Sequence, residues 1–136
     1  MRRSVFVLLS IVAAHGVARG QSAGNPAASH GKTVIQVSYF AQAGKADEVL
    51  SHRQHASDVL EKLGLPRGRV LRRVGGSEDE PDVLWECEYP NAGALEAALK
   101  AATSNPEFEE VRRHMATLIR KGERRVWEVQ EPPRPR

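Results

Sequence analysis

The stretch from Val83 to Met115 constrains the fold most, because a strand and two helices are predicted within it in direct succession. Residues 83–89 alternate between apolar and polar side chains, which is the two-residue period of a half-buried strand. The apolar face of this strand carries Trp85, Cys87 and Tyr89. A strand with such a face needs helices to pack against it, and the following residues supply them.

Two helices follow the strand and are separated by a sharp boundary. Residues 92–103 are rich in alanine and leucine, and their apolar side chains recur at the helical period. Asn105 is a favoured N-cap residue, and Pro106 suits the first helical position because no backbone N–H is needed there. We expect the last helix to run on past Met115 until Gly122 ends it.

The residues before Val83 predict one further strand–helix–strand unit. Residues 33–41 alternate as a strand, and residues 45–63 have the helical period before Gly64. The stripe of this helix comprises Ala46, Val49, Leu50, Arg53, Ala56, Leu60 and Leu63. Residues 69–74 predict a second strand, residues 75–81 an acidic loop, and Val126, Trp127 and Val129 a closing strand.

The order of these elements predicts an α+β domain over residues 33–130. Two successive strand–helix–strand units form a ferredoxin-like split βαβ fold. This fold has a four-stranded antiparallel sheet with the helices on one face. The other sheet face is left open, which favours pairing with a second copy. On that face we expect Arg69 and Arg73 to form cross-strand pairs with Glu86 and Glu88. Residues 131–136 predict an extended, proline-rich tail.

The first residues have the pattern of a secretory signal peptide. Arg2 and Arg3 precede an apolar run over residues 5–14, and Ala18-Arg19-Gly20 offers a small-residue cleavage site. The apolar run is shorter than the roughly 20 residues that span a bilayer. We therefore expect residues 1–20 to be removed and residues 21–32 to form a flexible spacer. The predicted mature protein is periplasmic or secreted by a bacterium, without stable membrane insertion.

The charge balance and the cysteine count narrow the function classes. The chain has 20 Lys and Arg against 17 Asp and Glu, and three of the bases lie in the first 20 residues. Cleavage would leave the two signs equal, so a nucleic-acid partner is not predicted. Cys87 is the only cysteine, so no internal disulfide forms, and its place in an apolar strand predicts a buried free thiol.

The sequence resembles the dimeric α+β barrel superfamily, which includes antibiotic-biosynthesis monooxygenase-like, haem-degrading, stress-responsive and NIPSNAP-like domains. The resemblance covers residues 33–130. It is carried by Val83-Leu84-Trp85-Glu86, the helix from Ala92, Ser104-Asn105-Pro106-Glu107-Phe108, and Val126-Trp127-Glu128-Val129. It implies a homodimer in which two sheets face each other, with a pocket for a small apolar ligand between the helices and the sheet of each subunit.

Two functions remain open from this resemblance. The first is cofactor-independent, monooxygenase-like oxygenation of a small aromatic or polyketide-like molecule, for which Tyr39, Trp85 and His114 are the candidate catalytic residues. Trp85 has an alternative interpretation as a core residue, and His114 as a surface residue on the flank of its helix. The second function is a non-enzymatic small-ligand-binding or stress-response module, which requires only the fold.

Haem and metal binding are less favoured by the residues. Haem-degrading members carry a His on the last helix and an Asn on the first strand. Here Arg112 falls at that helix position, with His114 two residues further on, and the first strand supplies Gln36. Plain haem binding stays a third alternative. His52 and His55 have the i, i+3 spacing of a metal pair, but no third ligand is near in sequence, so we predict no metal site and no cofactor.

Overall fold

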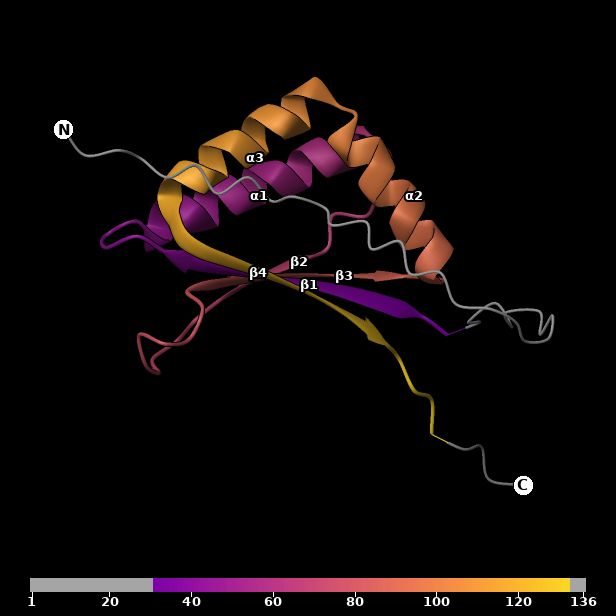
Figure 1. Cartoon of the computed structure of the whole chain (residues 1–136), viewed down its shortest axis with the longest axis horizontal. Helices are drawn as coiled ribbons and strands as arrows, with labels where there is room; N and C mark the ends of the chain where they lie inside the picture. Colours follow the sequence, from indigo (N-terminus) through magenta and orange to yellow (C-terminus); the bar gives the residue numbers. More distant parts are fainter. Residues whose placement is uncertain (1–30, 133–136) are drawn as a thin grey trace, which may run out of the picture.

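The computed structural model describes residues 31–132, which form one antiparallel sheet covered by helices on one side (Figure 1). The elements in chain order are β1 (Thr33–Ala41), α1 (Ala46–Lys62), β2 (Arg69–Arg72), β3 (Val83–Tyr89), α2 (Ala92–Thr103), α3 (Pro106–Leu118) and β4 (Ile119–Glu128). The strand order is β2-β3-β1-β4. This is the predicted ferredoxin-like split βαβ fold. The predicted signal peptide, most of the spacer and the end of the tail lie outside the described residues.

Local signals set the helix ends. Gly64 adopts a φ of 73°, and the backbone N–H groups of Gly64 and Leu65 donate to the carbonyls of Glu61 and Leu60. This pattern is a Schellman motif, which ends α1. The Asn105 side chain accepts a hydrogen bond from the Phe108 N–H at 3.0 Å, with Pro106 at the first helical position, as predicted. None of the helices in residues 31–132 is long and apolar enough to cross a membrane.

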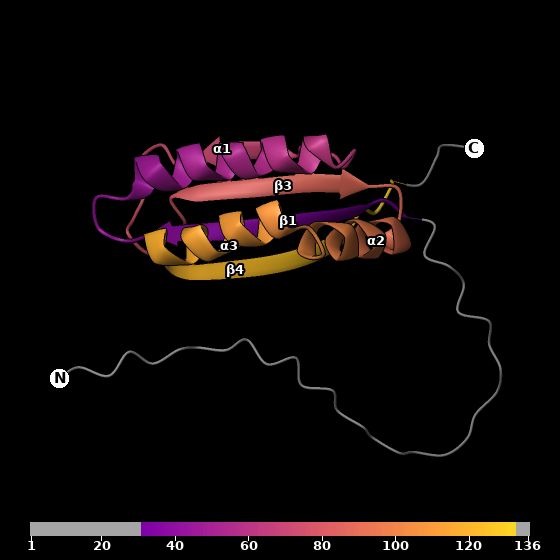
Figure 2. The same cartoon turned by 90° about the horizontal axis from the view of Figure 1, so that it is seen from above.

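The core lies between the helices and the central strands β1 and β3. Their register places Ile35 opposite Cys87, Val37 opposite Trp85 and Tyr39 opposite Val83, so these side chains share the helix-facing side. Seen from above, α1 runs along β3, and α3 runs along β1 and β4 (Figure 2). The helices contribute the buried side chains of Val49, Leu60, Leu95, Met115 and Leu118. The predicted apolar faces of the strands are therefore confirmed.

The closing strand begins earlier than predicted. α3 ends at Leu118, β4 starts at Ile119, and Gly122 lies inside β4 opposite Tyr39 instead of ending the helix. The reason is pairing at long range. The backbone of β4 follows β1 over its whole length, and most side chains of this edge strand stay exposed, so charged residues are tolerated there.

The second strand is shorter than predicted. β2 ends at Arg72, and Val74 is 97% exposed. Arg73 binds Asp82 across the base of the loop, with its Nη2 at 2.8 Å from Oδ1, so it does not pair with a glutamate of β3. Glu88 pairs with Lys32 at 2.9 Å instead. The predicted Arg69–Glu86 pair is confirmed at 2.6 Å, while the pairing of Arg73 with Glu88 is wrong because Arg73 lies beyond the strand.

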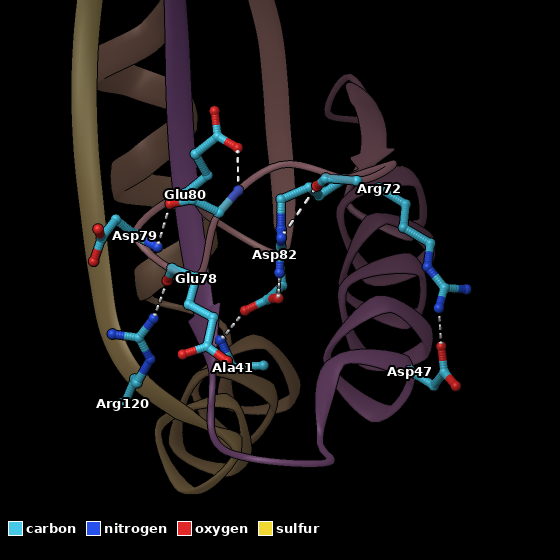
Figure 3. A network of polar contacts seen from close by, with 11 residues as sticks. Ala41, Asp47, Arg72, Glu78, Asp79, Glu80, Asp82 and Arg120 are labelled. Atoms are coloured by element: carbon cyan, nitrogen blue, oxygen red, sulfur yellow. Dashed lines mark hydrogen bonds and ion pairs between the residues drawn. The ribbon is translucent and has the colours of Figure 1, made fainter.

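A loop lies against one end of the sheet face that points away from the helices. Loop 73–82 reaches towards β4, where the Glu78 carbonyl accepts a hydrogen bond from Arg120 at 2.7 Å (Figure 3). Phe40, on this face, is buried beneath the cationic groups of Arg120 and Lys121. The rest of the face carries Gln36, Arg69, Glu86 and Trp127, and among residues 31–132 no helix covers it.

Candidate functional site

The three predicted site residues fall into two places. Tyr39 and Trp85 are buried on the helix-facing side of the sheet, in the same core cluster. His114 is exposed on α3 and lines a groove between α3 and α1. The structure therefore brings Tyr39 and Trp85 together and leaves His114 outside their cluster.

A buried arginine is the central polar group of the Tyr39–Trp85 cluster. Arg53 of α1 is 4% exposed, and its Cζ lies 4.5 Å from the centroid of the Trp85 ring. This is a cation–π contact with a tryptophan, the ring that attracts cations most strongly. The nearby side chains of Tyr39, Cys87 and Tyr89 favour the charged form of this guanidinium. We call Tyr39, Arg53, Trp85, Cys87 and Tyr89 the Arg53 cluster.

The positive charge of Arg53 is not balanced by an acid. Its Nη2 donates to Ser57 Oγ at 3.2 Å, while its buried Nε has no hydrogen-bond partner among residues 31–132. Within residues 31–132, no carboxylate forms a salt bridge with Arg53, and the side chains that influence its charge are Tyr39, Cys87 and Tyr89. Burial lowers the pKa of the guanidinium, and the neighbouring Tyr39 opposes that shift. A buried charge without a counter-ion is unfavourable for folding.

The loop between α1 and β2, residues 63–68, lies over the cluster. Trp85 Nε1 donates to the Arg67 carbonyl at 2.8 Å, and Ser57 Oγ donates to the same carbonyl at 3.0 Å. Gly68 has a φ of 66°, and a Cβ at this position would lie 2.4 Å from Trp85 Nε1. Only glycine allows the backbone to approach the indole this closely.

The free thiol of Cys87 is buried in the cluster, as predicted. Its sulfur lies 4.0 Å from the Pro66 carbonyl oxygen, so loop 63–68 covers it as well. Burial raises the pKa of the Cys87 thiol and of the Tyr89 hydroxyl, so both groups stay protonated and neutral near pH 7.

His114 belongs to a group of three histidines on the outer side of α1. The rings of His52 and His114 have centroids 4.5 Å apart, and those of His52 and His55 are 6.2 Å apart. His52 Nε2 donates to the Val111 carbonyl at 2.8 Å, which fixes its ring against α3. The histidines line an open groove of about 430 Å³ together with Asp47, Glu48, Ser51 and Leu118. In the described part of the chain, no three His, Cys, Asp or Glu side chains are placed to hold a metal ion.

Sequence reasoning placed Arg53 in the apolar stripe of α1 but did not select it as a site residue. Its signal was the presence of one charged side chain among Val49, Leu50, Ala56 and Leu60 in that stripe. The contact between His52 and His114 had no such signal, because the two residues are on helices whose packing is set by the whole fold.

The comparisons with known proteins concern the fold. No protein-family model matches the chain, and no curated protein matches it significantly in sequence. Among solved structures, an uncharacterized NIPSNAP domain protein from Burkholderia xenovorans has 16% sequence identity and a TM-score of 0.59, covering 76% of this chain and 99% of its own. SnoaB, a cofactor-independent oxygenase from Streptomyces nogalater, has 14% identity and a TM-score of 0.57, with 74% and 95% covered.

A further similar structure is a dimeric protein with a ferredoxin-like fold from Bacteroides fragilis. It has 13% identity and a TM-score of 0.56, and the match covers 72% of this chain and 96% of that one. These likenesses confirm the predicted ferredoxin-like α+β fold, which the chain shares with a NIPSNAP domain protein and with SnoaB.

Proposed function

We propose that the mature chain is an exported homodimer of the α+β barrel type that binds a small apolar molecule between its helices and its sheet. The observation that carries this proposal is the Arg53 cluster, in which one buried cation lies against the Trp85 ring in the same core as Tyr39. Apolar pockets with few, well-placed polar groups are typical of small-molecule sites. The open sheet face, with the exposed Trp127, supports pairing with a second copy.

Cofactor-independent oxygenation is the reaction that we propose if the bound molecule is also transformed. Its support is the fold shared with SnoaB, together with the aromatic side chains of Tyr39 and Trp85, which suit a planar substrate. His114 would act from the outer groove and not from the cluster, because it is exposed on α3.

Binding without turnover is favoured by the composition of the core. Among residues 31–132, neither the Arg53 cluster nor the buried Thr33, Ser38 and Ser57 includes a carboxylate or an imidazole. The described part of the cluster therefore lacks the two side chains that most often serve as general bases, and general-base catalysis needs a proton acceptor within reach. The binding module is accordingly the function that the geometry supports best.

Native mass spectrometry of the protein purified from its own host tests the proposal in one measurement. We expect a dimer with a retained small molecule. We also expect each protomer to have the mass of a chain whose first residue is Gln21. A monomer of full-length chains without any adduct would contradict all three parts. Oxygen consumption with anthrone or hydroxynaphthalenes then separates the oxygenase from the binding module.

A further inference from the structure

The unbalanced charge of Arg53 points to the chemical class of the ligand. The geometry points to a site in which the Arg53 guanidinium binds the carboxylate of a small aromatic acid, while Trp85 and Tyr39 contact its ring. This inference rests on the proposed small-molecule site and adds the charge of the occupant. Arg53 is not one of the candidate catalytic residues predicted from the sequence, which are Tyr39, Trp85 and His114.

The surroundings of the Arg53 guanidinium supply no negative charge among the described residues. Arg53 is enclosed by apolar and aromatic side chains, has no acid partner in the described residues, and keeps one buried donor, Nε, without an acceptor. The Ser57 hydroxyl, the Trp85 ring and the Tyr39 hydroxyl are its partners, and none of them is a carboxylate. A carboxylate would supply the missing negative charge and accept from Nε and an adjacent Nη at once, because the guanidinium fork matches a carboxylate.

The fold of the free protein does not require a charge at position 53. The stripe positions around Arg53 on α1 are occupied by Val49, Ala56 and Leu60, which are buried and apolar. An unbranched apolar side chain at position 53 would fill a similar volume without the desolvation of an unpaired cation. The present arrangement suits a protein whose ligand completes the ion pair.

A route to the site is offered by loop 63–68. Gly64, the second residue of the loop, and Gly68, its last residue, have positive φ angles of 73° and 66°. The loop leads into β2, an edge strand of four residues. Hydrogen bonds from Trp85 and Ser57 to the Arg67 carbonyl hold it over the cluster. Displacement of this loop would break these two hydrogen bonds and leave the pairing of β1 with β3 in place.

The test compares free acids with their methyl esters on the mature full-length protein. Benzoate, salicylate and 2-naphthoate are titrated by calorimetry, each against its neutral methyl ester, which has the same ring. We expect each acid that binds to do so at least about tenfold more tightly than its ester, because a charge-assisted bidentate contact is lost in the ester. Equal affinities would overturn the inference without contradicting the proposed small-molecule site. Binding of none of the six compounds would overturn the inference, and with an adduct-free native mass it would overturn the proposed site too.

Variants of Arg53 identify the group responsible. Arg53→Met should bring the acid affinity down to that of the ester and raise the melting temperature of the ligand-free protein, because an unpaired buried charge is removed. Arg53→Lys keeps the charge without the fork and should retain part of the preference for the acid. Arg112→Met, at an exposed arginine that pairs with Glu109, is the matched control and should leave the acid preference unchanged. A preference for the acid that survives in Arg53→Met, or a lower melting temperature of that variant, contradicts the role of Arg53.

Discussion

At the scale of single residues, Glu86 is the best-connected carboxylate on the open sheet face. It accepts from Arg69 Nε and Nη2 at 2.8 and 2.6 Å, and from Gln36 Nε2 at 2.7 Å. The hydrogen bond from Arg69 and then that from Gln36 lower the pKa of Glu86 below its ordinary value. A carboxyl whose pKa is depressed by folding stabilises the protein above its unfolded-state pKa, and this contribution is lost as the pH falls through the folded-state pKa.

The substitution Glu86→Gln should therefore have an effect that depends on pH. At pH 7 we expect a loss of up to about 1 kcal/mol in unfolding free energy, since Arg69 is largely exposed and solvent screens the pair. The loss should shrink as the pH falls below the ordinary pKa of glutamate, about 4.3, and through the lower pKa that Glu86 has in the folded protein. Urea unfolding between pH 3 and pH 8 measures both, with Glu96→Gln on the exposed side of α2 as control. A loss of the same size at every pH would show that the charge of Glu86 is irrelevant.

At the scale of elements, the α2–α3 boundary shows how a short sequence signal determines local structure. Asn91 caps α2 through a hydrogen bond from the Ala94 N–H at 2.9 Å, and Asn105 caps α3 in the same way. Pro106 prevents the two helices from merging, because the residue before a proline avoids the helical conformation. The buried positions of α3, Val111, Met115 and Leu118, depend on this start point.

We expect Asn105→Ala to reduce stability by about 1 kcal/mol, because the Phe108 N–H loses its acceptor. Asn105→Asp keeps the side-chain oxygen and adds a negative charge at the positive end of α3, so it should be neutral or stabilising. Thermal unfolding of the two variants beside the wild type gives the comparison. Equal melting temperatures for Asn105→Ala and Asn105→Asp would rule out the cap as a source of stability.

The elements that the sequence predicted well are those with signals in their own residues. The cap at Asn105, the end of α1 at Gly64 and the alternation of β1 and β3 are all local, and the structure confirms them. The start of β4 at Ile119 was missed because it is set by pairing with β1, which is distant in sequence. Arg53 was missed as a site residue for the same reason, since its lack of an acid partner depends on which side chains the fold places around it.

At the scale of the whole molecule, β4 offers a direct test of the proposed homodimer. Two adjacent residues of β4, Val126 and Trp127, are 51% and 50% exposed, but their side chains lie on opposite faces of the sheet. Val126 pairs with Ile35, whose side chain faces the helices, and Trp127 pairs with Val34 on the open face. If two sheets pair face to face, only Trp127 becomes buried between them.

Trp127→Asp should therefore weaken the dimer, raising its dissociation constant at least about thirtyfold, as expected for a buried interface tryptophan. Val126→Asp is the matched control, with the same new charge, the adjacent position and nearly the same exposure on the helix side of the sheet. Light scattering over a dilution series measures both variants. A dimer weakened by Val126→Asp alone would place the interface on the other side of β4.

The burial of Cys87 beneath the Pro66 carbonyl has a practical consequence for following loop 63–68. As the only cysteine of the chain, it reacts with a thiol reagent only when that loop lifts, so the rate of its labelling counts loop openings in the unmodified protein. A ligand bound at the Arg53 cluster would change that rate. The labelling rate of Cys87 would therefore report on ligand binding beneath α1 without any added probe.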